Sequence, residues 1–211
     1  MTFTSSHLRR LLLLAVASGL TLVVLTRTAQ AQELRQPEAR QGFYVSVGGG
    51  ANALAAWDKG HRDGVGWGPA YTLRFGEMLT ERWGLGLAIE TGSAKRRGVS
   101  LGMGGLTLEA QAQLWRHLAL RAGAGLGAAM AEDPLRIDDE THGTYGTLLT
   151  AALSYDAFLT SRPTGGWALT PMLGVRAVPG GDVTGLSVVA ALSVSWWSGL
   201  PARELRATSG P

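Results

Sequence analysis

The chain has 211 residues, no cysteine and a formal net charge of +3. This length fits one domain, and the lack of cysteine excludes a disulfide framework and cysteine-based zinc or redox motifs. Residues 1–31 hold three arginines and no acid, so the rest of the chain carries equal numbers of basic and acidic side chains. A neutral domain lacks the positive surface that phosphate backbones attract, which excludes nucleic acid as a partner.

Residues 1–31 have the layout of a secretory signal peptide. A pair of arginines precedes the largely apolar stretch Leu11–Leu25, and the small residues Ala29 and Ala31 follow it. This stretch is shorter than the roughly 20 residues that a spanning helix needs, which argues against an uncleaved anchor. We expect export, with cleavage before Gln32.

Beyond the signal, the chain predicts strands. No apolar run approaches the roughly 18 residues that mark a helical membrane span. Segments of about ten residues instead alternate large apolar with small or polar side chains, as strands with two different faces do. Eight such segments are expected, at Phe43–Ala53, Trp67–Gly76, Trp83–Gly92, Val99–Leu114, Leu118–Met130, Tyr145–Phe158, Trp167–Val178 and Leu186–Trp197.

The segment Val99–Leu114 changes phase at its glycine pair, 104–105. Leu101 precedes the pair and Leu106 follows it, at positions of opposite parity. A glycine bulge would keep both halves facing one way. Residues 106–122 also contain good helix formers, but the strict alternation at their start favours a strand.

The expected connections differ in length and polarity from one end to the other. Longer, polar connections are expected at 54–66, 93–98, 131–144 and 179–185, and shorter ones at 77–82, 115–117 and 159–166. Long outer loops and short periplasmic turns are typical of outer-membrane barrels, which would place the N-terminus on the periplasmic side.

The two faces of the segments indicate which solvent each one meets. The smaller face is mainly Gly, Ala, Ser and Thr with few charges, which suits the crowded lumen of a narrow barrel better than a water-exposed exterior. The large apolar face would then meet lipid, where closure removes unpaired strand edges. The sequence therefore predicts an all-β protein, an eight-stranded antiparallel up-and-down transmembrane β-barrel over residues 42–197. An N-terminal segment, 32–41, would precede it and a polar C-terminal tail, 198–211, would follow it.

Aromatic side chains mostly fall at the ends of the expected strands. Outer-membrane barrels carry aromatic girdles at both interfaces, although aromatics also favour strands in general. The predicted girdle consists of Trp67, Trp83, Trp115, Tyr145, Tyr155, Trp167, Trp196 and Trp197.

Charged side chains on the smaller face predict an ionic network in the lumen. The six candidates are Arg74, Glu90, Glu109, Arg121, Asp156 and Arg176, whose charges sum to zero. A charge inside a narrow barrel needs a partner, so we expect these side chains to pair with one another. The alternative places some of them near strand ends, in water.

This arrangement resembles the small outer-membrane barrels of the OmpA/OmpX type. The resemblance covers about residues 42–197 and includes the export signal, the alternating segments and a last segment ending in Trp196-Trp197. It implies location in a Gram-negative outer membrane, contact with its lipid and lipopolysaccharide, insertion by the barrel-assembly machinery and a monomeric state. The chain departs from the family by continuing past that aromatic end.

The expected role is structural, adhesive or surface-interacting, without enzyme activity, cofactor or metal, and with a lumen plugged by side chains unlike that of a general porin. The alternative is a lipid A-modifying enzyme, deacylase- or acyltransferase-like. A deacylase of that kind uses a His and a Ser two apart with a carboxylate, and His142-Gly143-Thr144 is the nearest match, with Thr in the nucleophile's place. An isolated loop histidine is more often solvated than catalytic. The acidic segment 132–140 could hold calcium, but its spacing does not match an EF-hand.

Overall fold

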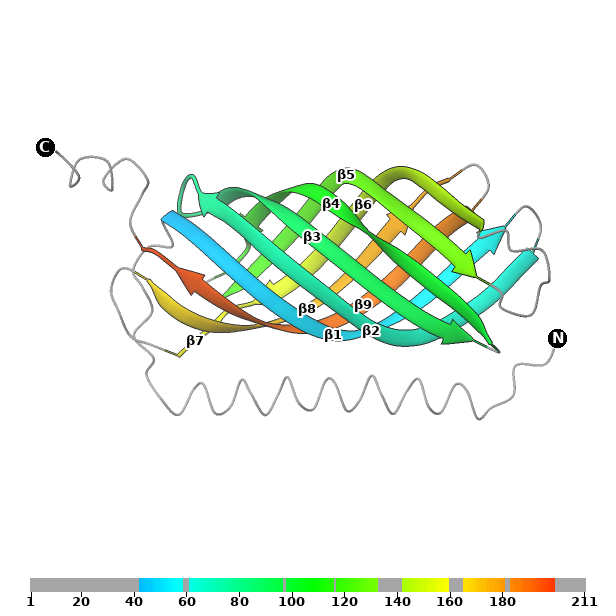
Figure 1. The fold of residues 1–211 in the computed structure, drawn as a ribbon. Helices are drawn as coiled ribbons and strands as arrows, with labels where there is room; N and C mark the ends of the chain where they lie inside the picture. The colour runs from blue at the N-terminus through cyan, green and yellow to red at the C-terminus, as the bar shows by residue number, and fades with distance from the viewer. Residues whose placement is uncertain are drawn as a thin grey trace, which may run out of the picture. The chain divides into compact units, whose positions relative to one another are not determined.

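The computed structural model describes residues 42–58, 61–96, 98–115, 117–132, 142–159, 165–180 and 183–199. These residues form β1 (Gly42–Asp58), β2 (His61–Met78), β3 (Trp83–Arg96), β4 (Val99–Gln113), β5 (Leu118–Glu132), β6 (His142–Tyr155), β7 (Ala157–Phe158), β8 (Gly166–Val178) and β9 (Val183–Trp197). One antiparallel sheet holds them in the order β6-β5-β4-β3-β2-β1-β9-β8-β7, and β6 also pairs with β8. The sheet therefore closes on itself, as Figure 1 shows.

The strands β6 and β7 together form one strand of the barrel. Ser154 pairs with Met172 and Ala157 pairs with Leu169, which is the same register on both sides of the break. Pro171 lies opposite the break, and proline has no amide hydrogen to donate to a ladder. The barrel thus has eight antiparallel strands, which confirms the predicted fold class.

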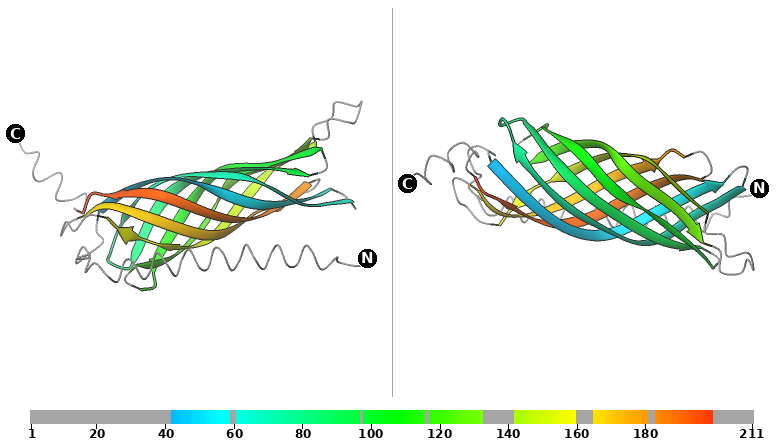
Figure 2. Two further views of the ribbon diagram at one scale, coloured as in Figure 1. Left: turned by 90° about the horizontal axis from the view of Figure 1, so that it is seen from below. Right: turned by 45° about the horizontal axis from the view of Figure 1, so that its top comes forward.

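Most of the large apolar side chains face outward. Val47, Tyr71, Leu108 and Leu173 are each about 60% exposed, and their sequence neighbours point inward. The strands tilt against the long axis of the barrel in both views of Figure 2, as closure of a sheet requires. No helix in the described part of the chain is long and apolar enough to span a membrane.

Two of the expected connections are largely strand. β1 and β2 stay paired up to Asp58 and His61, and β3 and β4 up to Arg96 and Val99. The expectation of loops over 54–66 and 93–98 was therefore wrong. Charged residues and glycines are frequent in both segments, for example Asp58, Gly64 and Lys95, and they obscure the alternation of apolar and polar side chains although the strands stay paired.

The expected bulge in β4 is also absent. β4 keeps one unbroken register with β3 and with β5 through Gly104 and Gly105. Leu101 and Met103 point into the barrel, where they are 2% and 4% exposed. Along β4 the inward-facing side chains change from apolar to polar, while the alternation of inward-facing and outward-facing residues continues without a break.

The lumen is apolar at both ends. The terminal end, where β1 begins and β9 finishes, lies at the left of Figure 1, and the hairpin end, where β1 turns into β2, lies at the right. One cluster fills the hairpin end: Leu54, Ala56, Ala94, Leu101, Met103, Ala129, Leu148 and Val178. Another fills the terminal end: Tyr44, Met78, Phe158, Ala168 and Trp197. The predicted signal peptide, the segment 32–41 and all but the first two residues of the tail lie outside the described residues.

Candidate functional site

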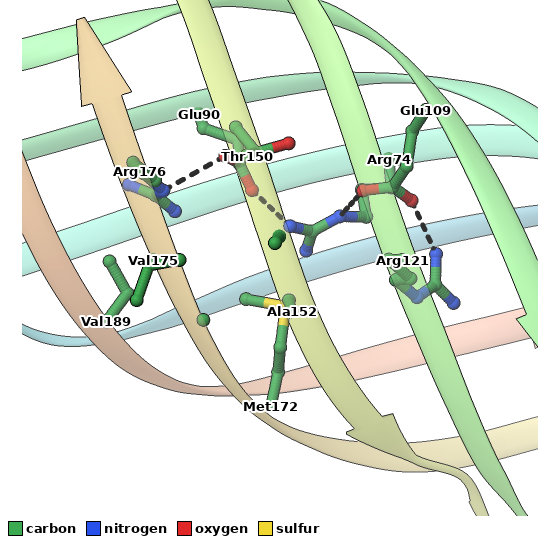
Figure 3. A pocket seen from close by; sticks show the side chains of 12 residues that line it. Arg74, Glu90, Glu109, Arg121, Thr150, Ala152, Met172, Val175, Arg176 and Val189 are labelled. Carbon is green, nitrogen blue, oxygen red and sulfur yellow. Dashed lines mark hydrogen bonds and ion pairs between the residues drawn. The ribbon is translucent and has the colours of Figure 1, made fainter.

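Five of the six predicted lumen charges form one continuous chain of ion pairs. Arg176 Nε lies 3.0 Å from Glu90 Oε2, and the other oxygen of Glu90 pairs with Arg74. Arg74 Nε donates to Glu109 Oε2 at 3.0 Å, and Arg121 Nη1 donates to Glu109 Oε1 at 2.9 Å. Figure 3 shows cations and anions alternating along the chain, and each residue is at most 3% exposed. Glu90 and Glu109, the two acids of this chain of ion pairs, therefore each lie between two guanidinium groups.

The chain of ion pairs crosses the barrel from wall to wall. Arg74, Glu90, Glu109 and Arg121 come from the consecutive strands β2 to β5, whereas Arg176 comes from β8. In the closed sheet β3 and β8 are four strands apart in either direction, so they lie on opposite sides of the lumen. The ion pair between Arg176 and Glu90 therefore spans the lumen.

Tyr44 extends the network towards the terminal end. Its hydroxyl accepts a hydrogen bond from Arg121 Nη1 at 3.3 Å, and the guanidinium carbon lies 5.3 Å from the ring centroid. Arg121 Nε also donates to Ser154 Oγ at 3.1 Å. Sequence reasoning missed Tyr44. The sequence did contain a signal for it: Tyr44 is an aromatic residue at an inward-facing position of its strand, and the other inward-facing positions there mostly carry small side chains.

Asp156 belongs to a second polar chain along the wall. Its Oδ1 accepts a hydrogen bond from Thr170 at 2.8 Å, and the Thr170 hydroxyl lies 3.0 Å from that of Ser195, which donates to Ser46. The charge of Asp156 also acts on Arg121. The ion-pair chain alone carries three cations and two anions, and Asp156 makes the set of six neutral.

Most of the predicted girdle faces outward. Trp67, Trp83, Trp115, Tyr145, Trp167 and Trp196 are between 39% and 85% exposed. Tyr155 is half-buried, with its ring centroid 5.1 Å from that of His117.

Trp197 does not lie on the predicted girdle. It is 3% exposed and packs in the lumen 4.8 Å from Tyr44 and 6.4 Å from Phe158, measured between ring centroids. Consecutive strand residues face opposite sides, so Trp196 and Trp197 cannot both meet the membrane.

The residues considered for enzyme or metal chemistry remain largely outside the described structure. His142 begins β6, but its side chain and the acidic residues 132–140 lie outside the described side chains. His117 Nδ1 lies 2.8 Å from the backbone oxygen of Asp156, and the backbone oxygen of His117 accepts a hydrogen bond from the Asp156 amide. His117 therefore links the turn between β4 and β5 to the break between β6 and β7. Among the described residues, no three His, Cys, Asp or Glu side chains gather as metal ligands would.

A small cavity adjoins the ion-pair chain between β6 and β8. Its lining includes all five members of the chain, together with Ala152, Gly174 and Met172. A water molecule's centre can occupy about 10 Å³ of it. This volume is the least that holds one water.

Comparison with known proteins shows which solved structures have a similar fold. No protein-family model matches the chain, and no curated protein matches its sequence. The attachment invasion locus protein Ail of Yersinia pestis superimposes with a TM-score of 0.51 at 12% identity, over 74% of this chain and 99% of Ail. Neisserial surface protein A superimposes with a TM-score of 0.50 at 13% identity, over 72% of this chain and 96% of that protein. The chain thus has the architecture of small eight-stranded outer-membrane barrels, as the sequence resemblance implied.

Proposed function

We propose that this protein is a bacterial outer-membrane barrel with a structural, adhesive or surface-interaction role and a lumen closed by side chains. The observation that carries the proposal is the ion pair between Arg176 and Glu90, which joins opposite walls of the barrel. A general porin needs a continuous aqueous channel, and here charged side chains occupy the middle of the lumen.

The outer surface supports a membrane location. Large apolar side chains cover the outside of the barrel, and eight exposed aromatics are among the described side chains: Phe43, Trp67, Tyr71, Trp83, Trp115, Tyr145, Trp167 and Trp196. A soluble protein rarely exposes so large an apolar surface, whereas lipid requires it. Closure of the sheet pairs each strand with a neighbour on both sides, so most backbone groups have partners within the barrel, as lipid, which offers no hydrogen bonds, requires.

The two apolar clusters support a closed lumen independently of the charges. Leu101 and Leu148 at the hairpin end are at most 2% exposed, as is Tyr44 at the terminal end. Water and ions would have to pass both clusters as well as the ion-pair chain. Liposome swelling tests this directly: vesicles containing the full chain should swell in arabinose no faster than empty vesicles. Fast swelling would overturn the closed-lumen proposal.

A surface-interaction role is the function class that the architecture favours. The related fold of Ail belongs to a protein named for attachment and invasion. The connection 133–141 joins β5 and β6 at the hairpin end, which we place outside the cell because the N-terminus would be periplasmic. An epitope inserted within 133–141 should bind antibody on intact cells, and deletion of the protein should reduce cell adhesion to a coated surface. Epitope exposure only after lysis would overturn the orientation, and unchanged adhesion the adhesive role.

Lipid A modification is the competing hypothesis from the sequence. It predicts a change in the lipid A mass spectrum when the protein is deleted, whereas a surface-interaction role predicts an unchanged spectrum. A Thr144→Ala variant separates the two hypotheses further, because Thr144 occupies the nucleophile position of the nearest motif match.

A further inference from the structure

Arg176 lies at the positive end of the ion-pair chain. Its one acidic partner among the described residues, Glu90, is shared with Arg74. The charges that act on Arg176 are those of Glu90 and Arg74, one negative and one positive. At the other end of the chain, the negative charge of Asp156 acts on Arg121. The positive charge that the five residues carry in excess is therefore concentrated at Arg176.

The acid that balances the whole set is too far away to neutralise Arg176. Asp156 accepts a hydrogen bond from Thr170, and Thr170 lies six residues before Arg176 on β8. Six residues of an extended strand span about 20 Å. On the other side of Arg176 the lumen is apolar, with Val178 and Leu148 in the cluster at the hairpin end. The described residues thus place no second acid beside Arg176.

The guanidinium group of Arg176 also has an unused donor. Its Nε pairs with Glu90 and its Nη1 donates to the backbone oxygen of Thr91, whereas Nη2 has no hydrogen-bond partner among the described residues. Figure 3 shows this group reaching from β8 into the lumen towards Glu90. Arg176 is 3% exposed and lines the small cavity, together with Thr150, its register partner on β6. A buried donor without a partner is costly, so the cavity favours an occupant that accepts a hydrogen bond.

Two threonine hydroxyls lie close to each other on the same part of the wall. A Cβ at Gly123 would lie 2.8 Å from Thr150 Oγ1 and 3.2 Å from Thr107 Oγ1. Thr107 Oγ1 is buried and has no hydrogen-bond partner among the described residues. Gly123 and Arg176 are the register partners of Thr150 on its two sides. Hydroxyl and guanidinium donors are therefore neighbours here, while the two acids of the ion-pair chain already have two guanidinium partners each.

We propose that this cavity is a binding site for one monatomic, monovalent anion such as chloride, with Arg176 Nη2 as its charged ligand and the Thr150 hydroxyl as a second donor. One such anion balances the three cations and two anions of the ion-pair chain where they lie, and a buried charge needs a partner at close range. The proposal goes beyond the proposed function, because it holds whichever partner the outer surface contacts.

The size of the cavity limits which anion can enter. A water molecule's centre can occupy about 10 Å³ of it, which excludes phosphate, sulfate and carboxylic acids. A chloride ion is only slightly larger than a water molecule. Met172 is part of the lining, and its unbranched side chain adapts to small changes of volume. Water is the competing occupant, and it would leave the charge of Arg176 unbalanced.

Anomalous scattering from bromide, which substitutes for chloride, tests the site. The full chain is refolded from urea in bromide buffer, so that the ion can enter before the barrel closes, and is then crystallised. We expect one anomalous peak inside the lumen, in contact with Arg176 Nη2. A water molecule or empty space at that position would overturn the proposal. Bromide found at the outer surface alone would mean an adventitious ion only, and would overturn it as well.

A second bromide experiment separates the anion site from the closed lumen. Protein that is folded in chloride and then transferred to bromide should take up the label much more slowly than protein refolded in bromide, because side chains block both ends of the lumen. Equally fast labelling would overturn the closed lumen and support the anion site. A lumen without label after refolding would overturn the anion site and leave the closed lumen standing.

Urea unfolding in lipid vesicles measures the same binding in solution. Chloride is exchanged for gluconate at constant ionic strength, because gluconate is too large for the cavity. A ligand that binds only the folded state should raise the folding equilibrium constant about tenfold for each tenfold rise in chloride above its dissociation constant. A folding constant that is the same in chloride and gluconate would contradict the proposal.

Three variants assign the effect to this site. Thr150→Asp places a carboxylate opposite Arg176, in the position of the anion, so this barrel should fold in gluconate and gain nothing from chloride. Arg176→Gln should also lose the chloride dependence if it folds. Thr72→Val is the matched control, since it removes a buried hydroxyl outside the cavity lining and should keep the full dependence. Wild-type chloride dependence in Thr150→Asp would overturn the proposal.

Discussion

Arg176 of β8 and Glu90 of β3 meet inside the barrel, with Nε 3.0 Å from Oε2, although their strands lie on opposite walls. Both side chains are at most 3% exposed. Opening a channel between them would leave two buried charges without this partner, and breaking a buried pair costs about 3–5 kcal/mol. The pair therefore ties the two walls together, which supports the proposed closed lumen.

Loss of one cation from the ion-pair chain should destabilise the barrel strongly. Arg121→Ala removes a partner of Glu109, together with the hydrogen bonds to Tyr44 and Ser154. The expected loss in the free energy of unfolding is about 3–5 kcal/mol. Urea unfolding of the barrel in lipid vesicles measures it.

The neighbouring residue supplies the control for this variant. Leu120 is 40% exposed on the outer face, so Leu120→Ile should cost less than about 1.5 kcal/mol. If the Arg121→Ala barrel is as stable as the parent, the buried charges are not mutually dependent.

Tyr44 should contribute more through its ring than through its hydroxyl. Tyr44→Phe removes one 3.3 Å hydrogen bond from Arg121, which keeps Glu109 as a partner, so the cost should be about 0.5–1.5 kcal/mol. Tyr44→Ala also empties the space beside Trp197 and Phe158 and should cost about 3–5 kcal/mol. Equal costs for the two variants, again by urea unfolding, would show that the ring does not pack as described.

Two glycines should differ sharply in their tolerance of alanine. A Cβ at Gly50 would lie 2.0 Å from the backbone oxygen of Ala190, so the strands β1 and β9 would have to separate. Gly50→Ala should therefore cost about 1–3 kcal/mol or more. A Cβ at Gly102 would meet only Met130, at 3.9 Å, and Gly102→Ala should change stability by less than about 1 kcal/mol. Similar urea midpoints for the two variants would contradict the close approach of β1 and β9.

The closed sheet should make gel mobility depend on heating. A closed barrel without free strand edges stays folded in dodecyl sulfate until it is boiled. Unboiled and boiled samples should therefore migrate differently. Identical migration would argue against a closed barrel.

The fold was predictable because its strongest signal is the alternation of large and small side chains. Leu106 and Leu108 face outward and Glu109 inward, as that alternation requires. The hairpin end was not predictable in the same way. There Leu101 and Met103 fill the lumen, so apolar side chains occur on the inner face, and parity alone could not show where the lumen changes from polar to apolar.

The candidate site was predictable in its members but not in its pairing. The inward parity of their positions identified all six charged residues. Their pairing depends on which strands lie opposite one another, and this is set only when the sheet closes. The separate place of Asp156 follows from its position at the break between β6 and β7, beside Thr170. Trp197 shows the limit of the girdle pattern, because position near a strand end does not determine which face a residue occupies.

Planar-bilayer recording of the wild-type protein tests the central claim, that side chains close the lumen. A general porin inserted under the same conditions serves as the control for detecting channels. The ion-pair chain and the two apolar clusters predict a flat current after insertion of the barrel, without steady steps. Steady conductance steps of about a nanosiemens would mean that a water-filled channel passes through the lumen, and would contradict the account.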